Sequence, residues 1–324
     1  MTSYAVSPVT GLGEVHAGDD LAALLANAAD LQEGDILVVT SKVVSKAEGR
    51  VVSNPKDDVV AAETARVVAR RGPTTIARHH LGLVMAAAGV DTSNTDPGSV
   101  VLLPRDPDAS AQALRTRLQE LTGRNVAVLV SDTFGRAWRT GQTDVAVGAA
   151  GIEPLDDHSG RVDAYGNPLL VTAPAVADQV TGAAELAQGK TTGVPAAVVR
   201  GLSARVLPAG RHGPGARALI RPEAEDMFGL GSREAVIAAL GDAGSVLPGF
   251  GAPAPATSLL DALATLGFAG EVVGDEIRVP LRGEPRAAGR NEARLEALLR
   301  AHGWVRADTT PDLWDPTMFR ATTP

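Results

Sequence analysis

The sequence predicts an α/β fold of the mixed (α+β) kind, and two observations support this prediction. Over the first two hundred residues, short β-branched runs alternate with segments whose apolar residues recur at helical spacing. Residues 244–257 are rich in proline and glycine, and a short helix–strand–strand–helix pattern follows them. We therefore expect a large domain over 1–243, a linker over 244–257 and a small C-terminal α-β-β-α domain over 258–324.

The expected elements follow from local patterns. Short β-branched runs between turn residues indicate buried strands, of which 125–130 is the strongest. Asp106 as a cap, Pro107 in the first turn and Gly123 after the last turn delimit one clear helix. Expected strands are 35–40, 100–103, 125–130, 144–147, 169–172, 196–199, 271–273 and 276–279, and expected helices are 19–29, 57–71, 106–122, 176–188, 231–240, 258–266 and 291–302.

Composition and charge exclude several classes of protein. Hydrophobic residues make up 44% of the 324 residues, which is too many for a disordered chain. No apolar run reaches the roughly 20 residues of a membrane helix, and the N-terminus lacks the pattern of a secretory signal. Cysteine is absent, which excludes disulfides, thiolate metal sites and cysteine nucleophiles. The net charge of −8 argues against nucleic-acid binding. Taken with the lack of cysteine and of a long apolar run, this leads us to expect a cytoplasmic protein that binds neither nucleic acid nor membranes.

Lysine is scarce and unevenly placed. The chain has 30 basic residues, of which only Lys42, Lys46, Lys56 and Lys190 are lysines. The first two lie in one hexapeptide, residues 41–46. Because a compact ammonium group suits a phosphate as a point charge, this hexapeptide hints at a phosphate site.

The most specific segment is SDTFGRAWR, residues 131–139, at the end of the strongest expected strand. An aspartate at the carboxyl end of a buried strand is where α/β proteins hold metals and catalytic groups. Asp132 and the Thr133 hydroxyl are hard oxygen donors, which suit Mg²⁺ or Mn²⁺. Arg136 and Arg139 are candidate contacts for phosphate or substrate. The alternative is a strand end with a capping aspartate and two solvated arginines.

Asp91 supplies a second carboxylate, in the segment Asp91-Thr92-Ser93-Asn94 that follows an apolar run. Taken alone, this segment is an ordinary turn. Taken with Asp132, it offers a pair of carboxylates that can share metal ions bound to a triphosphate.

Residues 213–218, GPGARA, match the G-x-G-x-x-A spacing of a dinucleotide-binding loop. Pro222 follows too closely for the long helix that such a loop needs, which argues against that interpretation. Two interpretations remain, a glycine-rich loop whose amides approach a phosphate and a plain surface turn.

Five segments stand in a fixed order along the chain. They are GLGE at 11–14, TSKVVSKAEGR at 40–50, GVDTSN at 89–94, SDTFGR at 131–136 with GQTD at 141–144, and LIRPE at 219–223. This order resembles the coenzyme F-420:L-glutamate ligases, the gamma-glutamyl ligases of deazaflavin biosynthesis. The resemblance runs from Gly11 to Phe228, and TSKVVSKAEGR and SDTFGR are its specific motifs.

The resemblance implies an activity, a fold and a site. Such enzymes use GTP and a divalent cation to join L-glutamate to the F-420 precursor through an acyl phosphate, and then extend a gamma-linked polyglutamate tail. The implied fold is a two-lobed ligase domain, here 1–243, in an intertwined homodimer. The implied GTP-binding residues are Gly11, Leu12, Gly13, Glu14, Ser41, Lys46 and Asn94, and the implied ligands of a two-metal Mg²⁺ or Mn²⁺ site are Asp91, Asp132 and Thr133.

The sequence departs from the family pattern in two places. Gly13 stands where a proline is common in the turn. Some actinobacterial relatives carry a long nitroreductase-like flavin domain after the ligase, and the residues after Phe228 are too few for it. We therefore expect no FMN.

Two other functions fit the same residues. One is another metal-dependent phosphoryl-transfer enzyme, such as a small-molecule kinase, and the other is a non-catalytic nucleotide-binding module. The presence of Asp91, Asp132 and Lys46 argues against the non-catalytic module. GTP hydrolysis measured with and without L-glutamate and the F-420 precursor separates the three.

Overall fold

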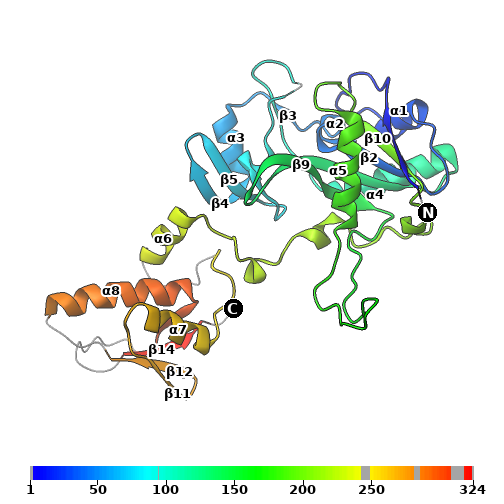
Figure 1. Cartoon of the computed structure of the whole chain (residues 1–324). Helices are drawn as coiled ribbons and strands as arrows, with labels where there is room; N and C mark the ends of the chain where they lie inside the picture. The colour runs from blue at the N-terminus through cyan, green and yellow to red at the C-terminus, as the bar shows by residue number, and fades with distance from the viewer. Residues whose placement is uncertain (1–2, 94, 242–248, 281–284, 308–316, 323–324) are drawn as a thin grey trace. The chain divides into compact units, whose positions relative to one another are not determined.

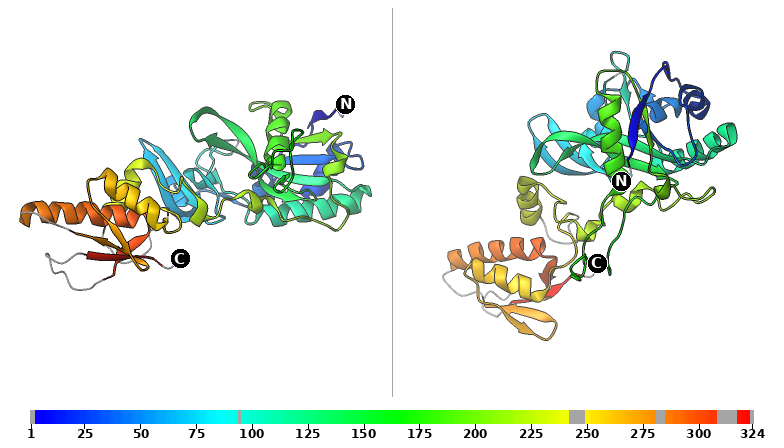
Figure 2. Two further views of the ribbon diagram at one scale, coloured as in Figure 1. Left: turned by 60° about the horizontal axis from the view of Figure 1, so that its bottom comes forward. Right: turned by 45° about the vertical axis from the view of Figure 1, so that its right-hand side comes forward.

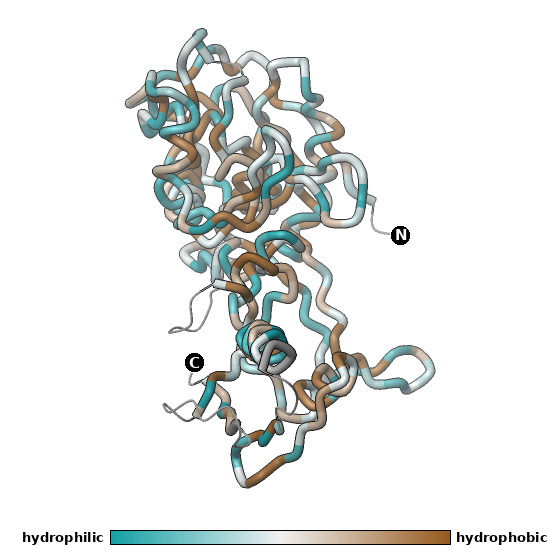
Figure 3. The backbone as a smooth tube through the Cα atoms, turned by 90° about the vertical axis from the view of Figure 1, so that its left-hand side faces the viewer, coloured by the Kyte–Doolittle hydropathy of each residue, from teal (hydrophilic) through white to brown (hydrophobic). Residues whose placement is uncertain are grey.

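A computed structural model describes residues 3–93, 95–241, 249–280, 285–307 and 317–322. The chain divides into two compact units, residues 1–66 with 76–220 and residues 67–75 with 221–324. The fold is mixed α/β as predicted, and hydrophobic and hydrophilic stretches alternate along the backbone of both units (Figure 3). The domain boundaries expected near 243 and 257 stay predictions, because residues 242–248 lie outside the described part.

The first unit is built on a five-stranded sheet with the order β1-β10-β2-β8-β9 (Figure 1). β2 and β8 run parallel, and the other neighbouring pairs run antiparallel. The strands are β1 (Ala5–Val9), β2 (Ile36–Thr40), β8 (Ala127–Arg136), β9 (Arg139–Ala150) and β10 (Ala196–Arg200).

Helices cover both faces of this sheet (Figures 1 and 2). Side chains alternate between the faces, so Leu37 and Val39 of β2 pack toward α1 and α4, whereas Ile36 and Val38 pack toward α5. A strand buried on both faces is the reason that β2 reads as a continuous apolar run. The helices are α1 (Leu21–Ala28), α2 (Ser41–Ala47) and α4 (Pro107–Thr122) on one face and α5 (Val176–Gln188) on the other.

Smaller elements complete this part of the fold. Helix α3 (Lys56–Glu63) follows the short strand β3, which pairs with β7. Short 3-10 helices occur at Ala87–Gly89, Ser203–Arg205 and Ala216–Leu219, and a further one, Glu223–Glu225, belongs to the second unit. The remaining strands are β3 (Val51–Val52), β7 (Val100–Val101), and a three-stranded sheet of β4 (Thr64–Arg71), β5 (Thr74–His79) and β6 (Val84–Ala86).

Two expected elements were wrong. The single helix expected over 57–71 is a helix only as far as Glu63 and a strand from Thr64. The Thr64 hydroxyl donates to the Val60 carbonyl at 2.6 Å as the helix ends, and the valines that follow favour a strand. Residues 169–172, expected as a strand, form none and lie in an exposed loop.

The second unit contains a four-stranded antiparallel sheet with the order β11-β12-β14-β13. Leu259 and Leu263 of α7, Ile277 of β12, and Trp304 and Phe319 form much of its buried core. Strands β13 and β14 add to the α-β-β-α pattern that the sequence predicts. The elements are α6 (Ser232–Leu240), α7 (Ala256–Thr265), β11 (Glu271–Val273), β12 (Glu276–Val279), α8 (Pro285–Ala301), β13 (Trp304–Arg306) and β14 (Thr317–Ala321). Throughout the described residues, no helix has the length and apolarity to span a bilayer.

Candidate active site

The TSKVVSKAEGR motif forms the last residue of β2 and the whole of α2. Thr40 lies opposite Ser131 in the parallel pairing of β2 with β8, so the next residues, Ser41 and Asp132, come side by side. Ser41 is buried, and its hydroxyl hydrogen-bonds the Asp132 carboxyl. The two most specific sequence motifs therefore meet at one end of the central strands.

Asp132 lies in a crowded acidic environment. Burial raises the pKa of its carboxyl to about 6, and the nearby charges of Asp144 and Asp91 act in the same direction. Hydrogen bonds from the Thr133 amide and from Ser41 oppose this shift without cancelling it. Negative charge therefore accumulates here, and a bound cation would relieve it.

Asp91 is placed by backbone pairing. Its amide donates to the Val101 carbonyl at 3.0 Å, and the Val101 amide donates to the Asp91 carbonyl at 2.8 Å. Its carboxylate contacts Lys42 Nζ at 2.8 Å and accepts from the Ser93 amide at 2.8 Å. Burial would raise the pKa of Asp91, but Lys42 and Ser93 outweigh it and lower the pKa to about 2. Asp91 is therefore ionised at any physiological pH.

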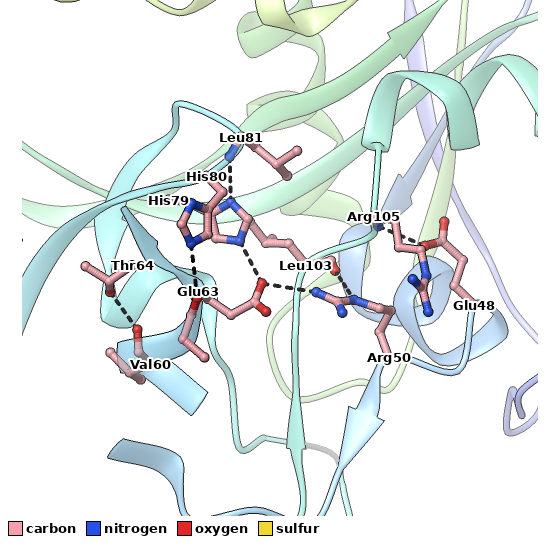
Figure 4. Close-up of polar contacts among 11 residues, drawn as sticks. Glu48, Arg50, Val60, Glu63, Thr64, His79, His80, Leu81, Leu103 and Arg105 are labelled. Atoms are coloured by element: carbon pink, nitrogen blue, oxygen red, sulfur yellow. Dashed lines mark hydrogen bonds and ion pairs between the residues drawn. The ribbon is translucent and has the colours of Figure 1, made fainter. Parts of the chain in front are cut away.

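The last residues of TSKVVSKAEGR, Glu48 to Arg50, hydrogen-bond the segment that follows Val101. Arg50 Nε donates to the Leu103 carbonyl at 3.1 Å (Figure 4). Glu48 accepts from the Arg105 amide at 2.9 Å. Because these bonds fix the chain just after β7, they also fix the strand that pairs with Asp91.

A partly buried acid–base cluster contacts Arg50 (Figure 4). Glu63 accepts from Arg50 at 3.0 Å and bonds His79 Nε2 at 2.9 Å. The Leu81 amide donates to His79 Nδ1 at 2.9 Å, so Nε2 carries the proton that Glu63 accepts. His79 is buried, and this burial lowers its pKa despite the Glu63 carboxylate.

Thr133 belongs to the opposite face of the sheet. Ser131 Oγ and Thr133 Oγ1 donate to the Asp144 carboxylate at 3.0 and 2.7 Å. Asp132, between them in β8, therefore points to the other face, toward Ser41. Lys190 Nζ donates to Thr133 Oγ1. Sequence reasoning missed Lys190 as a site residue, although its being one of only four lysines was a usable signal.

The GLGE turn comes near α2 through one ion pair. Lys46 Nζ pairs with Glu14 Oε1, and Leu12 is buried in the core next to them. Gly11 and Gly13 have φ of +78° and +72°, and a Cβ at either position would meet nothing within 4 Å. Glycine is therefore favoured at both positions by the backbone conformation and not by crowding. The space beside the turn is open.

Three predicted residues are not joined to this group by the contacts described. Arg136 Nη2 donates to the Thr140 carbonyl at 2.8 Å within the β8–β9 hairpin, and its side chain is exposed. Arg139 is exposed in the same hairpin. Asn94 lies outside the described residues. SDTFGR itself lies inside β8, which runs on to Arg136 past an irregularity at Val130, whereas the sequence suggested that the strand ended before it.

Two amides of the GPGARA loop are already bonded within the protein and are not offered to a phosphate. The Ala216 and Arg217 amides donate to the Asp108 carboxylate at 2.6 and 3.2 Å. Asp108 also accepts from the Ala149 amide at 2.9 Å and is buried. The loop is therefore anchored internally, by a carboxylate at the start of α4.

Asp91 and Asp132 fit a hard divalent cation in chemistry, because both are carboxylates and the charge of Asp91 acts on Asp132. Within the described ranges, no group of three or more His, Asp or Glu side chains is gathered as a metal cage. Substrate phosphates and water would therefore have to supply the remaining ligands, as they commonly do for Mg²⁺.

Comparison with known proteins points to one family. The family described as "F420-0:Gamma-glutamyl ligase" matches residues 11–72 and 53–201. A Methanopyrus kandleri protein named "Coenzyme F420:L-glutamate ligase" is 41% identical over 250 residues, which cover 70% of this chain and 98% of that protein. A Methanothermobacter thermautotrophicus protein of the same name is 39% identical over 246 residues, which cover 68% of this chain and 96% of that protein. An Archaeoglobus fulgidus protein of that name is 40% identical over 218 residues, covering 61% and 88%. The chain belongs to the F420-0:gamma-glutamyl ligase family.

Proposed function

We propose that this protein is a GTP-dependent ligase that adds L-glutamate to the coenzyme F-420 precursor and extends a gamma-linked polyglutamate tail. The observation that carries the proposal is the similarity to coenzyme F420:L-glutamate ligases along nearly their whole length. The meeting of TSKVVSKAEGR with SDTFGR at Ser41 and Asp132 supports it, because both motifs begin at one acidic site.

The chemistry needs an activated carboxyl group. A carboxylate oxygen of the precursor attacks the γ-phosphorus of GTP, and GDP leaves with the electrons of the broken bond. The glutamate amine then attacks the carbonyl carbon of the acyl phosphate. Phosphate leaves with the bridging oxygen and the amine loses a proton, so an amide forms and no side chain of the protein becomes covalently attached.

The residues of the site take roles that suit this chemistry. Asp91 and Asp132 would hold Mg²⁺ or Mn²⁺, which would neutralise charge on the transferring phosphoryl group. Ser41 would hold Asp132 in place, and the turn at 11–14 would bring backbone amides to the phosphates. Lys46 would exchange Glu14 for a GTP phosphate, and Asn94 completes the proposed GTP contacts.

Oxygen transfer tests the acyl phosphate directly. Precursor labelled with ¹⁸O in the reacting carboxyl group is incubated with GTP and L-glutamate, and the released phosphate is analysed by mass spectrometry. We expect one ¹⁸O atom in the phosphate for each amide formed. Phosphate without label, at the same yield of amide, would refute this route.

We also infer that the protein is a homodimer. The loop between β9 and α5 extends away from the sheet in Figure 1 and exposes large apolar side chains. Tyr165 and Val171 are each 92% exposed, which is unusual for such residues unless they meet another surface. Light scattering after size-exclusion chromatography should give twice the chain mass, and Tyr165→Ser with Val171→Ser should lower it. A monomer at micromolar concentration would refute the inference.

A further inference from the structure

Three of the four lysines contact predicted site residues. Lys42 pairs with Asp91, Lys46 pairs with Glu14, and Lys190 donates to Thr133. Only Lys56, exposed in α3, lies elsewhere. Apart from Lys56, all other basic side chains counted among the 30 are arginines. The compact ammonium groups of lysine are thus concentrated at the candidate site.

The hydrogen bonds at Thr133 fix what its hydroxyl can do. An ammonium group only donates, so Thr133 Oγ1 accepts from Lys190. Its one proton goes to Asp144 Oδ1, at 2.7 Å. A metal ion needs the same oxygen lone pairs as Lys190, so an ion bound to this hydroxyl would compete with the ammonium for its place.

The surroundings of Thr133 call for one positive charge. Asp144 is only 4% exposed, and its own amide donates to Glu185 at 3.1 Å. Asp178, also on α5, accepts from the Ala146 amide at 2.9 Å. Over the described ranges, none of these three carboxylates forms an ion pair with lysine or arginine. Lys190, one hydroxyl away from Asp144, supplies the positive charge on this face.

We propose that the Lys190 ammonium is the resident cation at Thr133 and Asp144, so that each chain binds one divalent cation, held by Asp91 and Asp132, where the family resemblance implies two. The proposal rests on the proposed function and specifies its metal site. The opposite orientations of Asp132 and Thr133 on β8 favour it, because consecutive strand side chains do not easily share one ion.

Counting bound Mn²⁺ tests the proposal. The full-length protein is titrated with Mn²⁺ in the presence of a non-hydrolysable GTP analogue, and the bound ions are counted by electron paramagnetic resonance. We expect one ion per chain for the natural protein and two, with magnetic coupling between them, for Lys190→Ala. Lys56→Ala is the matched control, since it removes the same charge far from Thr133, and it should bind one ion.

Two results would overturn the proposal: two ions per chain in the natural protein, or one ion in Lys190→Ala. Lys190→Met keeps most of the aliphatic stem and should behave like Lys190→Ala, which guards against an effect of lost packing. Asp132→Asn separates this proposal from the function on which it rests. If Asp132→Asn binds as many ions as the natural protein, the metal site of the proposed function is wrong, whatever Lys190→Ala shows.

Discussion

At the scale of single residues, two ion pairs join residues of the candidate site. Asp91 is paired with Lys42, and Glu14 is paired with Lys46. Asp132 has only hydrogen bonds to offset its burial, so its pKa is raised to about 6. Binding of a nucleotide with its metal would replace these internal pairs by pairs with phosphate and cation. Each residue can therefore be tested by a substitution with a matched control.

Lys46→Ala should weaken GTP binding by at least about tenfold, because a charge-assisted hydrogen bond contributes roughly 1.5–3 kcal/mol. Lys56→Ala, which removes an exposed lysine of α3, should bind GTP as the natural protein does. Lys190 is unsuitable as a control because it contacts Thr133. Equal affinities of Lys46→Ala and Lys56→Ala in a GTP titration would show that Lys46 does not contact GTP.

Asp132→Ala should fold normally and lose ligation by about a thousandfold or more, because metal charge stabilisation amounts to several kcal/mol and each 1.4 kcal/mol is about tenfold. Circular dichroism checks the fold, and a product assay measures the ligation rate. Asp57→Ala removes an exposed carboxylate of α3 and should ligate normally. Turnover of a folded Asp132→Ala protein near that of Asp57→Ala would contradict the metal assignment.

At the scale of elements, the sequence predicted correctly the helices and strands whose ends are set by residues close to them in the chain. The helix at 106–122 was predicted almost to the residue, because Asp106 caps α4 and Gly123 ends it with φ of +66°. The strands β11 and β12 were predicted with their bounds because Gly274-Asp275 between them is a two-residue hairpin turn. The prediction of one helix over 57–71 was wrong because the conformation of β4 depends on its pairing with another strand. The residues of 57–71 alone do not specify that pairing.

The candidate site was predictable only in part, because its contacts join distant residues. Ser41, Asp91 and Asp132 could be named from their motifs. The contact of Lys190 with Thr133 spans 57 positions, and the anchoring of Ala216 by Asp108 spans 108. No local pattern encodes such pairs, so the sequence could not show that the Ala216 and Arg217 amides of GPGARA are bonded to Asp108.

The cluster of Arg50, Glu63 and His79 should make stability fall in mild acid. The pKa of His79 is lower in the folded protein than its usual value of about 6.5, so the unfolded chain binds more protons between those two pKa values. The free energy of unfolding should therefore fall as the pH drops below about 6.5. Urea unfolding of the natural protein and of His79→Gln at pH 7.5 and 5.5 measures this.

His79→Gln, which cannot gain this charge, should lose less stability between the two pH values. His80→Gln is the comparison variant and should keep most of the pH dependence. His80 is exposed, bonds the Ala62 carbonyl at 3.1 Å, and adds only a minor contribution to the lowered pKa of His79, whose ring centroid lies 6.1 Å from its own. An equal pH dependence of the natural protein and His79→Gln would show that His79 does not carry the effect.

At the scale of the whole molecule, the chain is longer than the curated relatives that it matches. The match to the Methanopyrus kandleri protein covers 98% of that protein but 70% of this chain. The four-stranded sheet of the second unit has its own buried core, including Trp304, whose indole N–H donates to the Ala254 carbonyl at 2.8 Å. The second unit thus has a hydrophobic core of its own.

A truncated chain that ends at residue 243 should therefore still add the first glutamate, and the full-length protein should show no flavin absorbance. Removing α8 uncovers the side of α6 that packs against it, so light scattering must first show that the truncated chain is soluble. A soluble, folded truncation that fails to add the first glutamate would show that the C-terminal domain belongs to the active site.

In the proposed function, transfer of the γ-phosphate of GTP drives the formation of an amide between the F-420 precursor and L-glutamate. The most direct measurement follows GDP release with GTP alone, with either co-substrate and with both, while mass spectrometry follows the precursor. We predict GDP release that depends on both co-substrates, with one glutamyl residue added for each GDP in the first step. GDP release without glutamate, together with a phosphorylated precursor as the final product, would instead identify a kinase and contradict this account.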